Sequence, residues 1–317
     1  MILSLTIDEF NKIVTDELAG RRLDLALVEL FPEYSRARLQ QWVKCKAILV
    51  NGQPWRCRDK VSGGEAIRLS VPENNEVEAF VPEPVPLDVV YQDDSLLVLN
   101  KPQGRVVHPA AGNWGGTLLN GLLYQFPELS AVPRAGIVHR LDKDTTGLMV
   151  VARSLAAHKS LIEAMQNREI KRRYIALVHG QLISGRTIDE PMGRHPADRK
   201  RMAVVFNGKP AVTHFLIRQR FAAHMLLDVQ LETGRTHQIR VHMAHIKHPI
   251  VGDPVYGGRL RIPKDASDAL VQALRGFRRQ ALHAARLGLR HPLTGEEMAW
   301  EAPIPDDFSG LLATLQT

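Results

Sequence analysis

Residues 135–152, with the sequence AGIVHRLDKDTTGLMVVA, pass from a polar turn directly into an apolar segment. The polar part carries Asp142 and Asp144 among three basic residues, and the apolar part, residues 148–151, predicts a buried strand. Loops held by a rigid sheet often present the side chains that act on a substrate. We therefore expect Asp142 to lie on such a loop, although an Arg–Asp pair that only stabilises the fold is the commoner meaning of this charge pattern.

Short apolar segments separated by turn residues continue on both sides of this stretch. Alternation and composition predict strands, whereas few segments have the spacing of a substantial helix. Thr236 is expected to cap the second of the two predicted helices. The region from residue 88 to residue 317 is therefore assigned to the α+β class, with strands near 89–91, 96–100, 148–151, 174–178, 211–217 and 225–231, and helices at 156–168 and 236–246.

A stretch rich in proline and glutamate separates this region from a smaller N-terminal module, residues 18–75. Residues 71–86 contain four prolines, four glutamates and no basic residue, so residues 76–87 are predicted to form an extended linker. Apolar spacing in the module predicts two helices, with Ser35 capping the second. It also predicts a strand at 47–50 that enters a tight turn at Asn51 and Gly52, and a returning strand at 66–71. The module is therefore a small α/β domain.

The chain is basic, with 41 Lys and Arg against 34 Asp and Glu among 317 residues, and a pI near 9.5. Part of the excess lies in the N-terminal module, in a patch that either binds nucleic acid or is a solvated face. Between residues 34 and 68 only Asp59 and Glu65 are acidic, against Arg36, Arg38, Lys44, Lys46, Arg56, Arg58, Lys60 and Arg68.

Several classes of protein are excluded by composition. No apolar run approaches the roughly 20 residues that span a bilayer, and charged residues interrupt the N-terminus before a signal-peptide core could form. Cys45 and Cys57 are too few for a disulfide framework or a four-cysteine zinc site. We expect a cytoplasmic protein with reduced thiols and no membrane partner.

Motifs for nucleotides, zinc proteases and serine hydrolases are absent: GxxxxGK[ST], GxGxxG, HExxH and GxSxG do not occur. His242, His245 and His248 are spaced by three, with His237 upstream, and could share a metal on one helix. Pro249 disfavours helical geometry at His248, and no carboxylate lies in that helix. Histidines on a polar face are therefore preferred, with a metal-dependent hydrolase kept as an alternative.

A second polar cluster, residues 231–242 (LETGRTHQIRVH), again joins a predicted strand to a predicted helix and carries Arg235 and Arg240. With HRLD at 139–142, TGL at 146–148, RYIA at 173–176 and GD at 252–253, it resembles the signature segments of the bacterial ribosomal large subunit pseudouridine synthases of the A-type family. The resemblance covers about residues 20–305. Within it, residues 22–27, 35–43 and 50–52 resemble the S4-type RNA-binding domain.

The resemblance implies a mainly antiparallel catalytic sheet behind an S4-type domain, and isomerisation of specific uridines in 23S rRNA or the assembling large subunit by a monomer without cofactor or metal. It makes Asp142 the essential carboxylate, Arg240 the cation that pairs with it, and Tyr174 the ring that packs on the target base. Arg140 would displace the target nucleotide. Further RNA contacts are implied for His139, Arg235, Arg36, Arg38 and Lys44.

Other interpretations of the same residues stay open. Tyr174 alone reads as a core aromatic of a strand, and Arg140 and Arg240 as phosphate contacts. The basic stretches 168–173 and 199–201 either extend an RNA-binding surface or are solvated. A non-catalytic RNA-binding or ribosome-assembly protein is the alternative to an enzyme.

Overall fold

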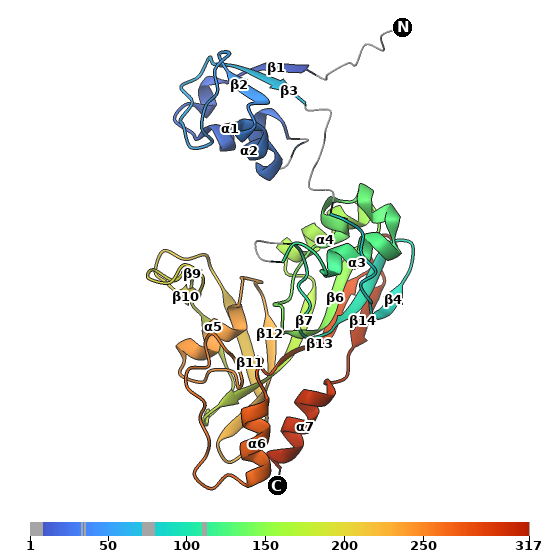
Figure 1. Ribbon diagram of the computed structural model, residues 1–317, viewed down its shortest axis with the longest axis vertical. Coiled ribbons are helices and arrows are strands. Elements are labelled where there is room, and N and C mark those ends of the chain that lie inside the picture. The colour runs from blue at the N-terminus through green and yellow to red at the C-terminus, as the bar shows by residue number, and fades with distance from the viewer. Residues whose placement is uncertain (1–8, 33, 35, 72–79, 110–112, 317) are drawn as a thin grey trace. The chain divides into compact units, whose positions relative to one another are not determined.

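The computed structural model of the chain describes residues 9–32, 34, 36–71, 80–109 and 113–316. Contacts divide the chain into two compact units, Met1–Ala79 and Phe80–Thr317 (Figure 1). Each unit has its own hydrophobic core. No helix in the described ranges is long and apolar enough to cross a membrane.

In its described residues, the N-terminal unit contains a three-stranded antiparallel sheet in the order β1-β3-β2 and two α-helices. Leu23 and Leu27 pack with Trp42 and Ile67 in its core. Asn51 and Gly52 have φ of 49° and 76°, the positive values that a two-residue hairpin turn requires, as predicted. The predicted cap Ser35 lies outside the described residues. The elements are β1 (Glu9–Ile13), α1 (Leu23–Leu30), α2 (Arg36–Lys44), β2 (Ile48–Val50) and β3 (Ala66–Ser70).

The predicted linker is wrong for residues 80–87, which are part of the second unit, while residues 76–79 lie outside the described ranges. Val85 is buried, and the Glu83 amide donates to the Asn120 carbonyl at 3.1 Å. The Asn120 side chain in turn donates to the Val81 carbonyl at 2.8 Å. Proline removes backbone donors from this segment, but the remaining polar groups still find partners in the neighbouring helix α3 (Leu118–Gln125).

The second unit is built on one sheet in the order β4-β5-β6-β13-β7-β12-β11-β8, with β14 added to β13. Among its described pairs only β6 and β13 are parallel, so the prediction of a mixed, mainly antiparallel sheet is confirmed. A Cβ on Gly147 would lie 2.3 Å from the Ala284 carbonyl oxygen, so glycine allows this parallel contact. The strands are β4 (Val89–Gln92), β5 (Leu96–Lys101), β6 (Thr146–Ala152), β7 (Lys171–His179), β8 (Arg186–Asp189), β11 (Val212–Arg220), β12 (His224–Leu231), β13 (Leu282–Arg290) and β14 (Glu297–Glu301), with β9 (Met192–Arg194) and β10 (Met202–Val204) as a separate hairpin.

Residues 96–99 of strand β5 are buried on both faces, which explains why all four are apolar. Leu97 and Leu99 pack in the main core with α3, whereas Leu96 and Val98 pack in a second cluster with α4 (Leu155–Gln166). The two helices therefore cover opposite faces of the sheet at β5 and β6. Packing on both faces holds β6 in place, including its first residue, which follows the Asp142 loop.

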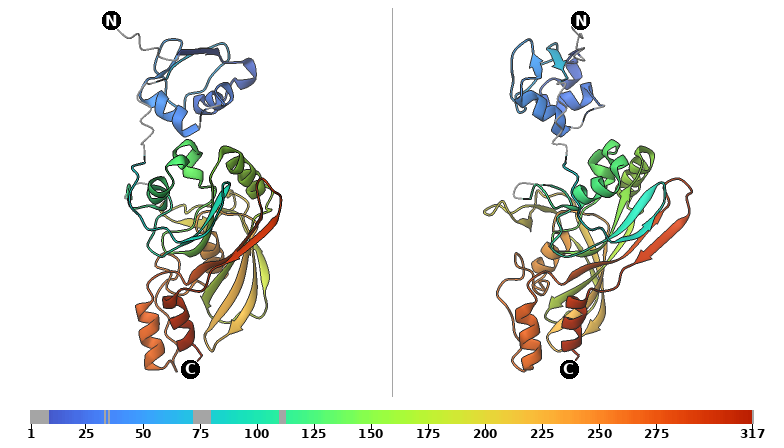
Figure 2. Two further views of the ribbon diagram at one scale, coloured as in Figure 1. Left: turned by 90° about the vertical axis from the view of Figure 1, so that its right-hand side faces the viewer. Right: turned by 45° about the vertical axis from the view of Figure 1, so that its right-hand side comes forward.

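Three helices of the second unit were not predicted: α3, α6 (Asp268–Gly276) and α7 (Asp306–Thr314). Each has only eight or nine residues, and all three contain a glycine, which has a low helix propensity. Helices α6 and α7 pack against each other beside the C-terminus (Figures 1 and 2). The predicted cap at Thr236 is also wrong, since α5 (Gln238–His245) begins after His237, which has φ of 59° and makes no side-chain cap.

Candidate active site

Asp142 lies on the loop before β6, as predicted, and is only partly buried, with 16% of its side chain exposed. The Thr145 amide donates to the Asp142 carbonyl at 3.1 Å and closes the turn. The Gln280 side chain donates to the Thr145 hydroxyl at 3.0 Å, so the turn is also tied to the segment before β13. The carboxylate is therefore held by a fixed backbone while part of it faces solvent.

Arg240 joins Asp142 to a second carboxylate. Its Nη1 donates to Asp142 Oδ2 at 2.9 Å, and its Nε and Nη2 donate to Asp253 at 2.7 and 2.9 Å. Burial opposes the charges, but the hydrogen bonds outweigh it, so the pKa of Arg240 is raised and that of Asp253 is lowered from their ordinary values. Arg240 thus stays charged and presents one fixed donor to Asp142.

His237 is a second basic neighbour of Asp142, with Nε2 3.8 Å from Oδ1, beyond hydrogen-bond distance. Burial lowers its pKa, despite the opposing effect of Asp142. Its Nδ1 lies 2.8 Å from the Tyr256 hydroxyl, which also accepts from the Met202 amide at 2.9 Å. The Tyr256 ring lies 5.1 Å from the Arg240 guanidinium and 5.2 Å from that of Arg201. Tyr256 therefore contacts both basic neighbours of Asp142 and the start of β10.

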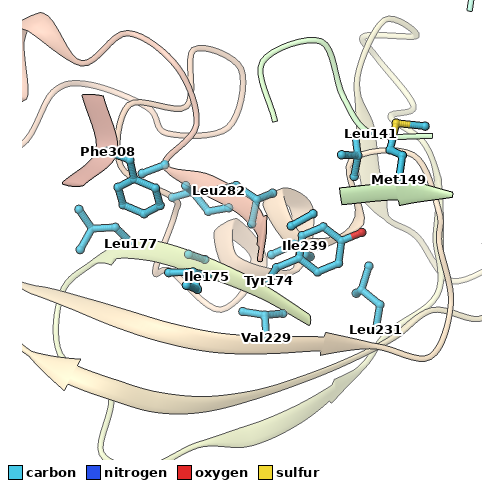
Figure 3. Close-up of a cluster of buried hydrophobic side chains, with 14 of the residues drawn as sticks. Leu141, Met149, Tyr174, Ile175, Leu177, Val229, Leu231, Ile239, Leu282 and Phe308 are labelled. Carbon is cyan, nitrogen blue, oxygen red and sulfur yellow. The ribbon is translucent and has the colours of Figure 1, made fainter. Parts of the chain in front are cut away.

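Tyr174 lies in the main core near Asp142. Figure 3 shows its ring beside Ile239, Val229 and Leu231, with the hydroxyl directed away from Phe308. Only 5% of the residue is exposed, and burial raises the pKa of its hydroxyl, an effect that the charge of Asp142 increases. The interpretation as a core aromatic is correct for its packing, yet the ring also lines the cavity at Asp142.

Asp142, Tyr174 and Arg240 line a common cavity. Its volume is about 50 Å³, roughly that of one or two water molecules. A larger hollow of about 720 Å³ is lined by Arg173, Tyr174 and His214 among others, but by neither Asp142 nor Arg240. The small cavity is therefore the candidate site, lined by Arg140, Asp142, Arg172, Tyr174, Gly234, Arg235, His237 and Arg240 among others.

The other predicted contacts around this site have different surroundings. Arg140 and Arg235 are exposed at the cavity. A substrate contact for His139 is wrong in this geometry, because its Nε2 accepts from the Val150 amide at 3.0 Å and its Nδ1 is covered without a partner. Burial lowers the pKa of His139 to about 3, so it is a neutral residue of the loop's support.

In the N-terminal unit the three predicted RNA contacts are not equivalent. Arg36 donates to the buried Asp24 at 2.7 Å, so it stabilises the fold whatever else it binds. Arg38 lies over the Trp42 ring at 5.2 Å. Lys44 is exposed and lines a basic hollow with Lys46, Arg56 and Arg58.

The histidines of the series do not share one environment: His245 is exposed, as predicted for a polar helix face, whereas His242 is not. His242 is fully buried and contacts the Thr213 hydroxyl and the Glu190 carbonyl at 2.9 and 3.1 Å, so the preferred interpretation is wrong for it. His248 bonds to the His179 carbonyl at 2.8 Å. In the described part of the chain no three His, Cys, Asp or Glu side chains gather as a metal site would require.

Comparison with known proteins places this site in a family. The family model for RNA pseudouridylate synthase matches residues 95–245, which hold Asp142, Tyr174 and Arg240. Ribosomal large subunit pseudouridine synthase D of Xanthomonas campestris pv. campestris is 54% identical over 304 residues, 96% of this chain and 92% of that protein. The chain belongs to the RNA pseudouridylate synthase family. The protein of the same name from Escherichia coli (strain K12) is 53% identical over 97% of this synthase and 94% of its own length.

Solved structures agree with the assignment of the synthase fold. Human RNA Pseudouridylate Synthase Domain Containing 4 superposes with a TM-score of 0.56 at 27% identity, over 72% of this chain and 93% of that one. Human RNA Pseudouridylate Synthase Domain Containing 1 gives 0.53 at 27% identity, over 70% and 84%. The synthase is thus an isomerase with a mixed α+β catalytic fold.

Sequence reasoning missed three supports of the synthase site: Lys101, Tyr256 and the role of Asp253. The Lys101 ammonium is buried and donates to the carbonyls of Pro102, Arg105 and Lys143 at 2.8, 3.0 and 2.8 Å, and burial lowers its pKa to about 7. It ties the chain after β5 to the residue next to Asp142. The available signal was a lysine just after the apolar run 96–99, since a charge buried at that position needs buried partners.

Proposed function

We propose that this synthase converts uridine to pseudouridine in 23S ribosomal RNA, with Asp142 as the essential carboxylate. The observation that carries the proposal is the partly open Asp142 carboxylate, held by Arg240 beside the Tyr174 ring. The relatives named for the large ribosomal subunit, which match nearly the whole chain, support the choice of RNA.

The reaction breaks the N1–C1′ bond of uridine, turns the uracil and forms the C5–C1′ bond; C5 loses a proton and N1 gains one. Asp142 acts on the sugar as an ionised carboxylate, because both attack at C1′ and removal of the 2′ proton require that form. Arg240 donates a hydrogen bond to Oδ2 and so fixes the direction of the carboxylate. The side chains themselves thus provide the charge and the orientation.

Tyr174 holds the detached uracil by packing against its ring, and its hydroxyl takes part in moving the C5 proton. Burial keeps this phenol un-ionised, so it accepts a proton only as it passes its own to a neighbouring acceptor. Arg140, exposed at the cavity, takes the place of the target nucleotide when that nucleotide leaves its stack.

The N-terminal unit acts as an S4-type RNA-binding domain. Its basic hollow, with Lys44, Lys46, Arg56 and Arg58, contacts phosphates and positions the RNA without selecting a base. We place the enzyme in the cytoplasm as a monomer; size-exclusion chromatography with light scattering tests the latter.

The function is tested by incubating the protein with 23S rRNA transcribed without modified nucleotides, in EDTA and with monovalent salt to maintain the RNA fold. Pseudouridine is then mapped by chemical modification and reverse transcription. The proposal expects pseudouridine at a small number of 23S positions and none in a 16S transcript. Absence of product from 23S rRNA and from assembling large subunits contradicts it.

The hydroxyl of Tyr174 is tested separately with Tyr174→Phe, which keeps the aromatic face. Loss of a positioned proton transfer is expected to lower single-turnover rates about 10²- to 10⁴-fold while RNA affinity stays unchanged. Near-normal turnover would leave the ring as a packing surface only.

A further inference from the structure

Arg172 on β7 is a buried cation for which the described residues provide no hydrogen-bond or ion-pair partner. Only 7% of the residue is exposed, and its Nε has no hydrogen-bond acceptor. No carboxylate within the described ranges forms an ion pair with it. The other two buried arginines differ: Arg240 binds Asp253 and Asp142, and Arg279 binds Asp307 at 2.6 and 2.8 Å.

An unpaired buried charge destabilises a fold, because the interior replaces none of the hydrogen bonds that water would give. A methionine of similar length would fill the same space without this cost. A charge in such a position is therefore explained best by a partner that arrives with the substrate.

The surroundings of Arg172 indicate where that partner lies. Arg172 and Tyr174 are two residues apart on one strand, so they face the same side of the sheet, and both line the cavity at Asp142. A Cβ on Gly234 would lie 2.8 Å from Arg172 Nη1, so the guanidinium reaches the exposed turn that begins at Gly234. Nearby Asp142 is already bound to Arg240.

We infer that Arg172 binds a backbone phosphate of the nucleotide that enters the Asp142 cavity; this inference rests on the proposed function. Phosphate is the group of RNA with a full negative charge, and only such a group neutralises the guanidinium. Two parallel N–H donors of an arginine match two phosphate oxygens. A uracil carbonyl would leave the charge uncompensated.

The test compares Arg172→Met with Arg173→Met, which removes the same charge from the opposite side of the same strand, where the side chain is exposed. Binding to an unmodified 23S transcript is measured across a series of KCl concentrations. Arg172→Met is expected to weaken binding about 10- to 100-fold and to reduce the salt slope by about 0.7 to 0.9. Arg173→Met is expected to leave both unchanged.

Stability distinguishes a ligand contact from a structural role. The urea midpoint of Arg172→Met is expected to equal or exceed that of the wild type, since the variant removes an unpaired charge. A lower midpoint with unchanged RNA affinity, failure to fold, or an unchanged salt slope would each overturn the inference.

Gly234→Ala gives a second test that leaves Arg172 in place. Its added methyl displaces the guanidinium, so RNA binding is expected to weaken in the wild type but not further in Arg172→Met. Equal losses in both backgrounds contradict a contact through Arg172. Because these readouts measure binding, they remain informative if the wild type makes no pseudouridine, an outcome that counts against the proposed function instead.

Discussion

The two units of the protein use buried carboxylates in opposite ways. Asp24 in the N-terminal unit is fully buried and receives hydrogen bonds from Arg22, Arg36 and Gln40 at 3.0, 2.7 and 2.5 Å. Burial raises its pKa, but these bonds, with Arg36 foremost, outweigh that effect and lower it. Asp142 in the second unit accepts a hydrogen bond from one arginine, Arg240, and its side chain is partly exposed.

Within the second unit, the two carboxylates that Arg240 binds differ in the same way. Asp253 is completely buried and accepts two bonds from Arg240 and two from the amides of Val255 and Tyr256. Asp142 shares the same arginine with a single bond. A carboxylate whose hydrogen bonds are complete stabilises the fold, whereas one with free capacity can act on a substrate.

Replacement of Asp142 should give the largest effect. Asp142→Asn keeps the size and leaves Arg240 bound to Asp253, so the unfolding free energy should change by less than about 1 kcal/mol. Single-turnover rates should fall at least about 10³-fold, because the amide cannot act as nucleophile or base. A tenth of wild-type turnover would remove Asp142 from its proposed role.

Asp253→Asn should reverse that pattern. Removing the buried partner of Arg240 should lower the unfolding free energy by about 3–5 kcal/mol in urea. The matched control is Asp228→Asn, which breaks the exposed pair with Arg218 and should cost less than about 1 kcal/mol. Equal, small effects would mean that Asp253 does not hold the site together.

Acidification should destabilise the second unit more than the N-terminal unit, because all 13 histidines lie at or beyond residue 108. Burial lowers the pKa of His139 to about 3, so between pH 6.5 and 3 the unfolded chain binds a proton that the folded chain excludes. Stability is therefore lost as pH falls, by about 2 kcal/mol at pH 5 from His139 alone. Hydrogen exchange should show this loss in β6 and not in α1.

His139→Gln is the control for this pH effect. Its side-chain oxygen can accept from the Val150 amide but does not titrate, so the stability of the second unit should fall less steeply between pH 7 and 5. An unchanged slope would assign the acid sensitivity to other buried histidines, such as His179, whose pKa burial lowers to about 4.

The smallest expected effect is a difference in stability of the N-terminal unit between variants at Arg36 and at Lys44. Arg36→Met removes a half-exposed partner of Asp24 and should destabilise this unit by about 1–2 kcal/mol, seen as faster exchange of α1 amides. Lys44→Met should leave exchange unchanged and reduce only the salt slope of RNA binding. Equal exchange in both variants would show that the Asp24 cluster contributes little.

The sequence by itself determined the features that depend on neighbouring residues. Alternation and apolar runs predicted six strands of the catalytic sheet, including β5 and β6. This was possible because a buried strand needs apolar side chains at successive or alternate positions. The turn at Asn51 and Gly52 could be predicted because it requires positive φ angles, which asparagine and glycine adopt more readily than other residues. The polar turn before β6 likewise placed Asp142 on a supported loop.

Only the tertiary structure decided which distant groups meet and which are left alone. Asp142 and Arg240 are 98 positions apart, and their contact depends on the order in which β6, β13 and β7 are arranged. The same order buries Arg172 where no carboxylate of the described residues pairs with it, and it places His242 beside the Thr213 hydroxyl and the Glu190 carbonyl. Both are ordinary polar residues in the sequence. Hydrogen-bond completeness is a property of the whole fold, because each partner comes from a different segment, and it is this property that separates the residues that hold the site from those left to bind and act.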